Sequence, residues 1–128
     1  MRECRPDWAA VAHRLAHRAE ALLQDPTGAL VISIDGSEHY VQWHGEDRRD
    51  LYCESSSGLY GGTSLPEARA RQLVALGWDR PYEGWGGQDV ANFSRLFTAP
   101  VRVYDVVRLT CRTLAEVYGA LPDDVSWP

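Results

Sequence analysis

Two histidines and a glutamate near the amino terminus are the first residues whose types and spacing could do chemistry. His13, His17 and Glu20 stand at positions i, i+4 and i+7, a spacing at which a helix can present two imidazoles and a carboxylate to a metal ion. They also lie opposite the apolar stripe of the same helix, where a solvated polar surface is the usual outcome. We favour the solvated surface and expect no metal, with a metal-dependent enzyme as the alternative.

The three cysteines give weaker evidence for a functional site than the two histidines and the glutamate do. Cys4, Cys53 and Cys111 are an odd, widely spaced set that fits neither a disulfide framework nor a CxxC zinc pattern, so we expect free thiols. Cys111 falls on an apolar helix stripe, where cysteine more often packs as a small apolar side chain than acts as a nucleophile. Neither a phosphate-binding glycine motif nor GxSxG is present. The sequence therefore predicts a non-enzymatic protein without a cofactor.

Length and charge narrow the class of protein. The chain has 128 residues, which favours one domain over residues 1–128. A net charge of -5 argues against a protein that neutralises nucleic-acid phosphates, although all 13 cationic residues are arginine. The sequence has no apolar run long enough to span a bilayer, and its start lacks the apolar stretch of a signal peptide. We expect a cytoplasmic protein without a membrane partner.

Apolar periodicity predicts the elements that must position any site. Helices are expected at residues 7–24, 64–77 and 102–118. Alternating segments predict three strands, at residues 29–34, 39–44 and 50–55, with 92–97 as a candidate fourth strand. The predicted fold is α+β, an antiparallel three-stranded meander packed on one face by helices, with the fourth strand added to it.

Three helix ends have recognisable signals. Asp7 is the expected N-cap of the first helix. Ser64 and Glu67 have the spacing of a capping box at the start of the second helix. Gly77 is expected to end that helix in a left-handed conformation, with Trp78 folding back on Leu73 as in a Schellman motif.

Alternation also divides the meander into two faces. The face toward the helices takes Leu30, Ile32, Ile34, Val41, Trp43, Leu51 and Cys53. Helices can cover only one face, so the other presents the residues we expect to bind a partner: Val31, Tyr40, Gln42, His44, Tyr52 and Glu54. Tyrosine beside amide and carboxylate groups is typical of an interface. The same face could equally be solvated, or be covered by segment 79–97.

The segment LGWDRPYEGWGGQDVANFSR, residues 76–95, holds two tryptophans and four glycines between two predicted helices. Trp78 is assigned to the helix end, which leaves Tyr82 and Trp85 in a glycine-flanked loop. A loop of this length in a small domain is packed, functional or disordered. We favour a lid over the edge of the core, because wet aromatic rings are costly, and keep a partner site as the alternative.

Several motifs together resemble one family. "GALVIS", "YVQW", "LVALGW" followed by Pro81, "NFSRLF" and "RTLAEVYG" are similar to actinobacterial TY-Chap or YbjN-like domains related to type III secretion chaperones, over residues 7–121. The resemblance implies an α-β-β-β-α-β-β-α plan, a homodimer, and a secreted or toxin-like protein partner held as an extended peptide. The sequence predicts one strand, at 92–97, where the family plan has two. An immunity or regulatory protein that binds a folded partner is the alternative function.

Overall fold

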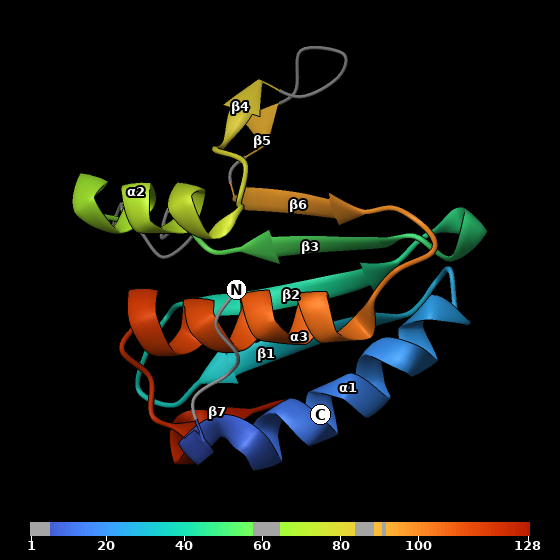
Figure 1. Ribbon diagram of the computed structural model, residues 1–128. Helices are drawn as coiled ribbons and strands as arrows, with labels where there is room; N and C mark the ends of the chain where they lie inside the picture. The colour runs from blue at the N-terminus through green and yellow to red at the C-terminus, as the bar shows by residue number, and fades with distance from the viewer. Residues whose placement is uncertain (1–5, 58–64, 84–88, 91) are drawn as a thin grey trace.

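A five-stranded antiparallel sheet forms the centre of the molecule, in the order β6-β3-β2-β1-β7. The computed structural model describes residues 6–57, 65–83, 89–90 and 92–128. The strands of this sheet are β1 (Ala29–Ile34), β2 (Tyr40–Gly45), β3 (Leu51–Ser55), β6 (Phe93–Phe97) and β7 (Val125–Ser126). A two-stranded ribbon, β4 (Tyr82–Glu83) with β5 (Asp89–Val90), extends beyond the β6 edge (Figure 1). The predicted α+β class, meander and fourth strand are confirmed.

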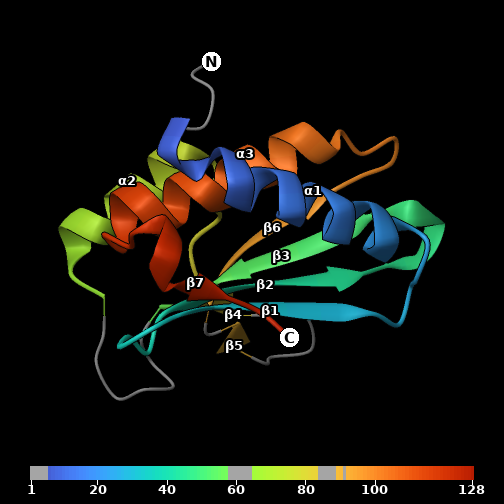
Figure 2. The same cartoon turned by 90° about the horizontal axis from the view of Figure 1, so that it is seen from below.

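Three helices pack on one face of this sheet. They are α1 (Ala9–Leu23), α2 (Glu67–Leu76) and α3 (Val103–Arg112). A π-helical turn, Thr113–Val117, continues α3. Short 3-10 turns occupy Pro6–Trp8, Asp47–Arg49 and Pro122–Asp124. All three α-helices lie on the same side of the sheet (Figure 2), and α3 runs between α1 and α2.

The core lies between the helices and the inner face of the sheet. Its strand residues are the seven predicted from alternation, and all seven are buried. Helix α1 contributes Val11, Leu15, Ala19 and Leu22 from its predicted stripe. The burial of these strand residues follows from the period of two, because alternate side chains of a strand point to the same face. A one-residue slip in register would turn every inner side chain outward.

Two indole groups fix α3 over the sheet. Trp43 Nε1 donates to Thr110 Oγ1 at 3.1 Å, and Trp78 Nε1 donates to Thr113 Oγ1 at 2.9 Å. Thr113 Oγ1 in turn donates to the carbonyl of Leu109 at 2.7 Å. Both tryptophans are almost completely buried, so each needs a partner for its N–H, and the two threonines provide it.

The end of α2 follows the predicted Schellman geometry. Gly77 has φ +121°, and its N–H donates to the Val74 carbonyl at 3.1 Å. The Trp78 N–H donates to the Leu73 carbonyl at 3.0 Å. This turn directs Trp78 into the core, so the expected role of Trp78 as a helix stop is confirmed.

Both expected helix starts need correction. Helix α1 begins at Ala9 after the 3-10 turn, which puts Trp8 rather than Asp7 at its N-cap. Helix α2 begins at Glu67 with Pro66 at the N-cap, because the ψ of Pro66 is extended at 146°. Glu67 accepts from Arg80 Nη2 at 2.9 Å. Ser64, the other member of the expected capping box, lies outside the described residues.

The chain after α3 also departs from expectation. The apolar stripe of the third predicted helix, continued by its spacing, would bury Leu121, but Leu121 is 63% exposed. The π-helical turn changes the helical phase, and Gly119 at φ +69° ends the helix before Leu121. The following segment forms β7, which pairs with Ser33 and Ile34 of β1 and was not predicted. A two-residue strand carries too little alternation to be recognised.

A close backbone approach at Gly45 generates a stability prediction. Gly45 donates its N–H to the Gly28 carbonyl at 2.9 Å, and a Cβ on Gly45 would come within 1.9 Å of the Asp25 carbonyl oxygen. We expect Gly45→Ala to lower the free energy of unfolding by about 3 kcal/mol, because the turn after α1 must move. Urea denaturation measures this change.

Gly36→Ala is the matched control for this measurement. Gly36 has φ +74° but open space around its Cβ position, so its substitution should cost only about 1 kcal/mol of conformational strain. Equal losses in the two variants would contradict the close approach at Gly45.

Candidate functional site

The outer face of the sheet, opposite the helices, is built from two cross-strand rows. The first row runs Val31, Gln42, Glu54 and Ser94 across β1, β2, β3 and β6. The second row runs Ala29, His44, Tyr52 and Leu96 across the same strands. Paired residues on one face of neighbouring strands are in side-chain contact range, so each row is a continuous strip. Five of the six predicted sheet residues lie in these rows.

The centre of the first row is a polar group that is already satisfied. The Gln42 side-chain amide donates to the Glu54 carboxylate, and His44 Nε2 lies 3.5 Å from Glu54 Oε2. The His44 side chain is 38% exposed and that of Glu54 is 18% exposed. His44 and Tyr52 also face each other, with ring centroids 6.4 Å apart. The strip is therefore held in place by its own contacts, as a preformed recognition surface is.

Exposed apolar side chains stand at the two sides of the outer face. Val31, on β1, is 41% exposed, and Leu96, on β6, is 50% exposed. Leu96 was not among the predicted site residues. The alternation of NFSRLF could have identified it, because Ser94 and Leu96 share the face that Phe93 and Phe97 do not.

Both sides of the face end at a partly unpaired strand edge. Strand β7 covers only Ser33 and Ile34 of β1, and the Asp79 bridge covers only Ser94 of β6. In an antiparallel ladder the backbone groups of alternate residues point to the same side. The next backbone N–H and C=O groups that point outward along these edges are those of Val31 and Leu96. No described strand lies beside either residue.

Tyr40 and Tyr52 have different surroundings although both are half-buried. Tyr52 occupies the middle of the second row. Tyr40 lies at the end of the sheet, where its hydroxyl accepts from Asn92 Nδ2 at 3.0 Å and its N–H donates to Ser56 Oγ at 3.1 Å. Tyr52 therefore lies nearer than Tyr40 to the centre of the outer face.

A polar cluster on the helix side closes the same end of the sheet. The rings of His39 and Tyr118 stack with centroids 4.7 Å apart, and His39 Nδ1 lies 3.0 Å from Ser56 Oγ. Tyr118 donates its hydroxyl to the Ser56 carbonyl at 2.6 Å. Burial raises the pKa of the Tyr118 hydroxyl. The phenol thus stays protonated and serves as a hydrogen-bond donor that joins the end of the π-helical turn to β3.

The other sequence candidates are placed apart from this face. His13, His17 and Glu20 are exposed on α1, with the Nε2 atoms of the two histidines 3.3 Å apart. Within residues 6–57, 65–83, 89–90 and 92–128, no three histidine, cysteine or acidic residues are grouped to hold a metal ion. Strand β4 contains Tyr82, but the Tyr82 side chain and all of Trp85 lie outside the described part of the chain, so the choice between lid and partner site stays a prediction.

Two of the cysteines are buried and reduced. Cys53 lies on the inner face of β3 and Cys111 lies in α3. Burial raises the pKa of the Cys53 thiol, and the nearby Arg95 lowers it only in part. A thiol in such surroundings is a packing group rather than a nucleophile. Cys4 lies outside the described residues.

One family accounts for the chain over nearly its whole length. The family model TY-Chap3, described as "T3SS (YopN, CesT) and YbjN peptide-binding chaperone 3", matches residues 1–125. The chain belongs to the TY-Chap3 family. This match confirms the resemblance seen in the sequence and places the chain among peptide-binding chaperones. Searches of curated proteins and of solved structures find no match. None of the described helices has both the length and the apolar character required to cross a membrane.

The buried thiols lead to a labelling prediction. In a Cys4→Ser variant, a thiol reagent at mildly alkaline pH should label neither Cys53 nor Cys111 in the native protein, because both are inaccessible and Cys53 stays protonated. Both should react after denaturation in guanidinium, which is the positive control. Rapid labelling of the native variant, read by mass spectrometry, would contradict the burial of these side chains.

Proposed function

We propose that this TY-Chap3 protein holds an extended segment of a secreted or toxin-like partner on the outer face of its sheet. The family supports peptide binding in general. The observation that carries the proposal is the pair of cross-strand rows that none of the described helices covers, which end in exposed Val31 and Leu96 beside partly unpaired edges. The proposal needs no catalytic step and no cofactor, and we keep the cytoplasm as the expected location.

The β1 edge offers the longer run of unpaired backbone. The pairing of β7 with β1 ends at Ser33. The backbone groups of Val31 and Ala29 on that edge therefore have no neighbouring strand among the described residues. A peptide that pairs there would continue the sheet where β7 stops, and main-chain hydrogen bonds would give affinity without regard to sequence. Figure 2 shows this edge of β1 with β7 beside only part of its length.

The two rows supply the side-chain contacts. An extended peptide presents alternate side chains to one face, and those of the bound segment would meet Ala29 and Val31 of β1 first. Residues of the same partner that continue over the face would reach Tyr52 and Leu96, which provide apolar area. Glu54, held by Gln42 and His44, keeps the centre of the surface polar, which suits a reversible complex better than a permanent one.

A proline substitution tests the edge directly. Val31→Pro removes the N–H that points to the open edge, which an edge strand tolerates, whereas Val31→Ala shortens the side chain and keeps the N–H. We expect Val31→Pro to weaken binding of a short, uncharged peptide that alternates valine and threonine by at least about tenfold, or about 1.4 kcal/mol. Fluorescence anisotropy measures the affinity. Equal binding by the proline and alanine variants would rule out pairing at this edge.

Tyr52→Ala tests the face separately. Tyr52 is half-buried in the middle of the second row, whereas the Tyr40 hydroxyl is tied to Asn92 at the end of the sheet. Its removal should weaken binding of a peptide long enough to cross the face by about 1–2 kcal/mol, with a smaller change in the unfolding free energy. Val74→Ala, an exposed apolar truncation on α2, is the control. Unchanged affinity in Tyr52→Ala would remove the face from the proposal.

Homodimerisation remains part of the proposal because the family resemblance implies it. Open strand edges at β1 and β6 give a second copy a place to pair. Light scattering at micromolar concentration should report twice the chain mass of 14.3 kDa. A mass equal to that of one chain would count against the dimer and leave the peptide-binding proposal intact.

A further inference from the structure

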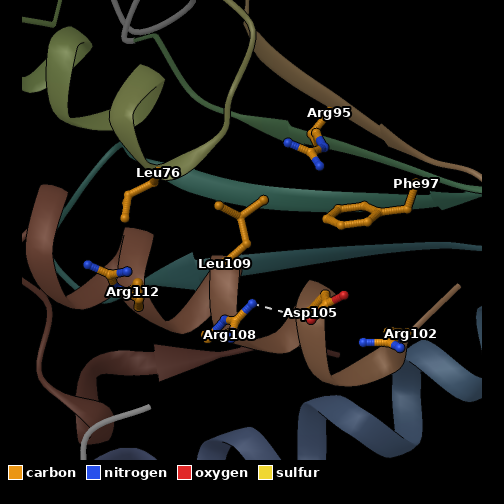
Figure 3. Close-up of a pocket in the computed structure, with 8 residues that line it drawn as sticks. All are labelled: Leu76, Arg95, Phe97, Arg102, Asp105, Arg108, Leu109 and Arg112. Carbon is orange, nitrogen blue, oxygen red and sulfur yellow. Dashed lines mark hydrogen bonds and ion pairs between the residues drawn. The ribbon is translucent and has the colours of Figure 1, made fainter. Parts of the chain in front are cut away.

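A pocket of about 480 Å³ lies on the helix side of the sheet, between α3 and β6 (Figure 3). It exists because α3 covers the centre of the sheet and leaves the inner face of the edge strand only partly covered. Its apolar wall consists of Leu109 from α3, Phe97 from β6 and Leu76 at the end of α2. The sheet separates this pocket from the outer face, so the two surfaces can be tested independently.

Four arginines line the same pocket. Arg95 comes from β6, and Arg102, Arg108 and Arg112 come from the start, middle and end of α3. Asp105 is the one acidic residue in the lining. The whole chain carries a net charge of -5, so the pocket has the opposite sign to the molecule around it. Such a concentration of charge selects a ligand of opposite sign.

The existing contacts of these arginines leave donors for a ligand. Arg108 pairs with Asp105 at 3.3 Å, and Arg95 donates to the Gly77 carbonyl at 2.9 Å. Arg112 holds the Glu116 carboxylate through Nε at 2.6 Å and Nη2 at 3.1 Å. The Arg102 guanidinium makes no hydrogen bond or ion pair with the part of the chain that the structure describes. A guanidinium has five N–H donors in a planar fork that fits a carboxylate. Arg102 therefore offers its donors to an anionic group, and the other three arginines add positive charge beside it.

The spacing of the charges fits a chain better than a single ion. Arg102 and Arg112 are ten residues apart on one helix, which is about 15 Å at 1.5 Å per residue. An extended peptide covers this distance in about five residues. Apolar side chains of such a peptide could pack on Leu109 and Phe97 between its carboxylates. A small anion would engage only one end of this arrangement.

We propose that the pocket between α3 and β6 binds an extended acidic segment of a polypeptide, with one carboxylate on Arg102 and the others along the positive charge that Arg108 and Arg112 continue. The segment belongs to a partner protein, and its recognition depends on charge, in contrast to the backbone pairing proposed for the outer face. No pattern in the sequence indicated this site, because Arg95 and the α3 arginines line one pocket only when β6 pairs with β3.

A charge-matched pair of peptides tests this site. The probe alternates glutamate and leucine, and its control alternates glutamine and leucine. The wild-type protein should bind the glutamate peptide at least about tenfold more tightly, and added salt should reduce that preference. Arg102→Gln combined with Arg112→Gln should abolish the preference. Arg14→Gln combined with Arg18→Gln removes the same charge from exposed positions on α1 and should preserve it.

The remaining outcomes are equally decisive. Equal binding of the two peptides, or an unchanged preference in the Arg102/Arg112 variant with an unaltered thermal unfolding midpoint, would overturn the proposal. Tighter binding of oligothymidine than of the glutamate peptide would assign the pocket to nucleic acid instead. Loss of a dimer in the Arg102/Arg112 variant would assign it to a second copy of the chain. The uncharged valine–threonine peptide carries no carboxylate for the arginines, so its binding should be unchanged in the Arg102/Arg112 variant and failure at one site is distinguishable from failure at the other.

Discussion

The hydrogen bonds from the indoles of Trp43 and Trp78 to Thr110 and Thr113 hold α3 against the centre of the sheet. Because these indoles are buried, loss of either threonine would leave an unpaired donor in the core, which typically costs about 1–3 kcal/mol. The position of α3 in turn brings α1 and α2 to its two sides and places all three helices on one face. Every surface that can bind a partner follows from this arrangement.

Two recognition surfaces with different chemistry result from it. All helices in the described part of the chain lie on the opposite side from the outer face, whose rows end in exposed Val31 and Leu96 beside partly unpaired edges. On the helix side, the edge strand β6 is only partly covered, and arginines line the remaining space. An extended polypeptide suits both surfaces, through backbone pairing at the first and carboxylates at the second. A partner segment with an apolar stretch and an acidic stretch could use both.

The parts of the fold that were predictable depend on short-range rules. Alternation placed Trp43 and Cys53 inward, because the side-chain period of a strand is two, and Gly77 marked a helix end because its backbone conformation needs glycine. Long-range pairing was not predictable. Ser126 pairs with β1 through a two-residue strand. Arg95 lines the same pocket as Arg102 only because β6 pairs with β3. The outer-face residues were found, but Leu96, their most exposed neighbour, was not.

Residue-level mapping of a bound peptide tests the central claim most directly. In an amide chemical-shift titration of the isotope-labelled protein with the uncharged valine–threonine peptide, the account predicts the largest changes at Ala29, Val31 and their neighbours in the outer rows. Hydrogen exchange at the Val31 amide should slow in the complex, because that N–H gains a partner. Changes confined to α1 or to the core side of the helices, with Val31 unaffected, would contradict a chaperone surface on the open face of the sheet.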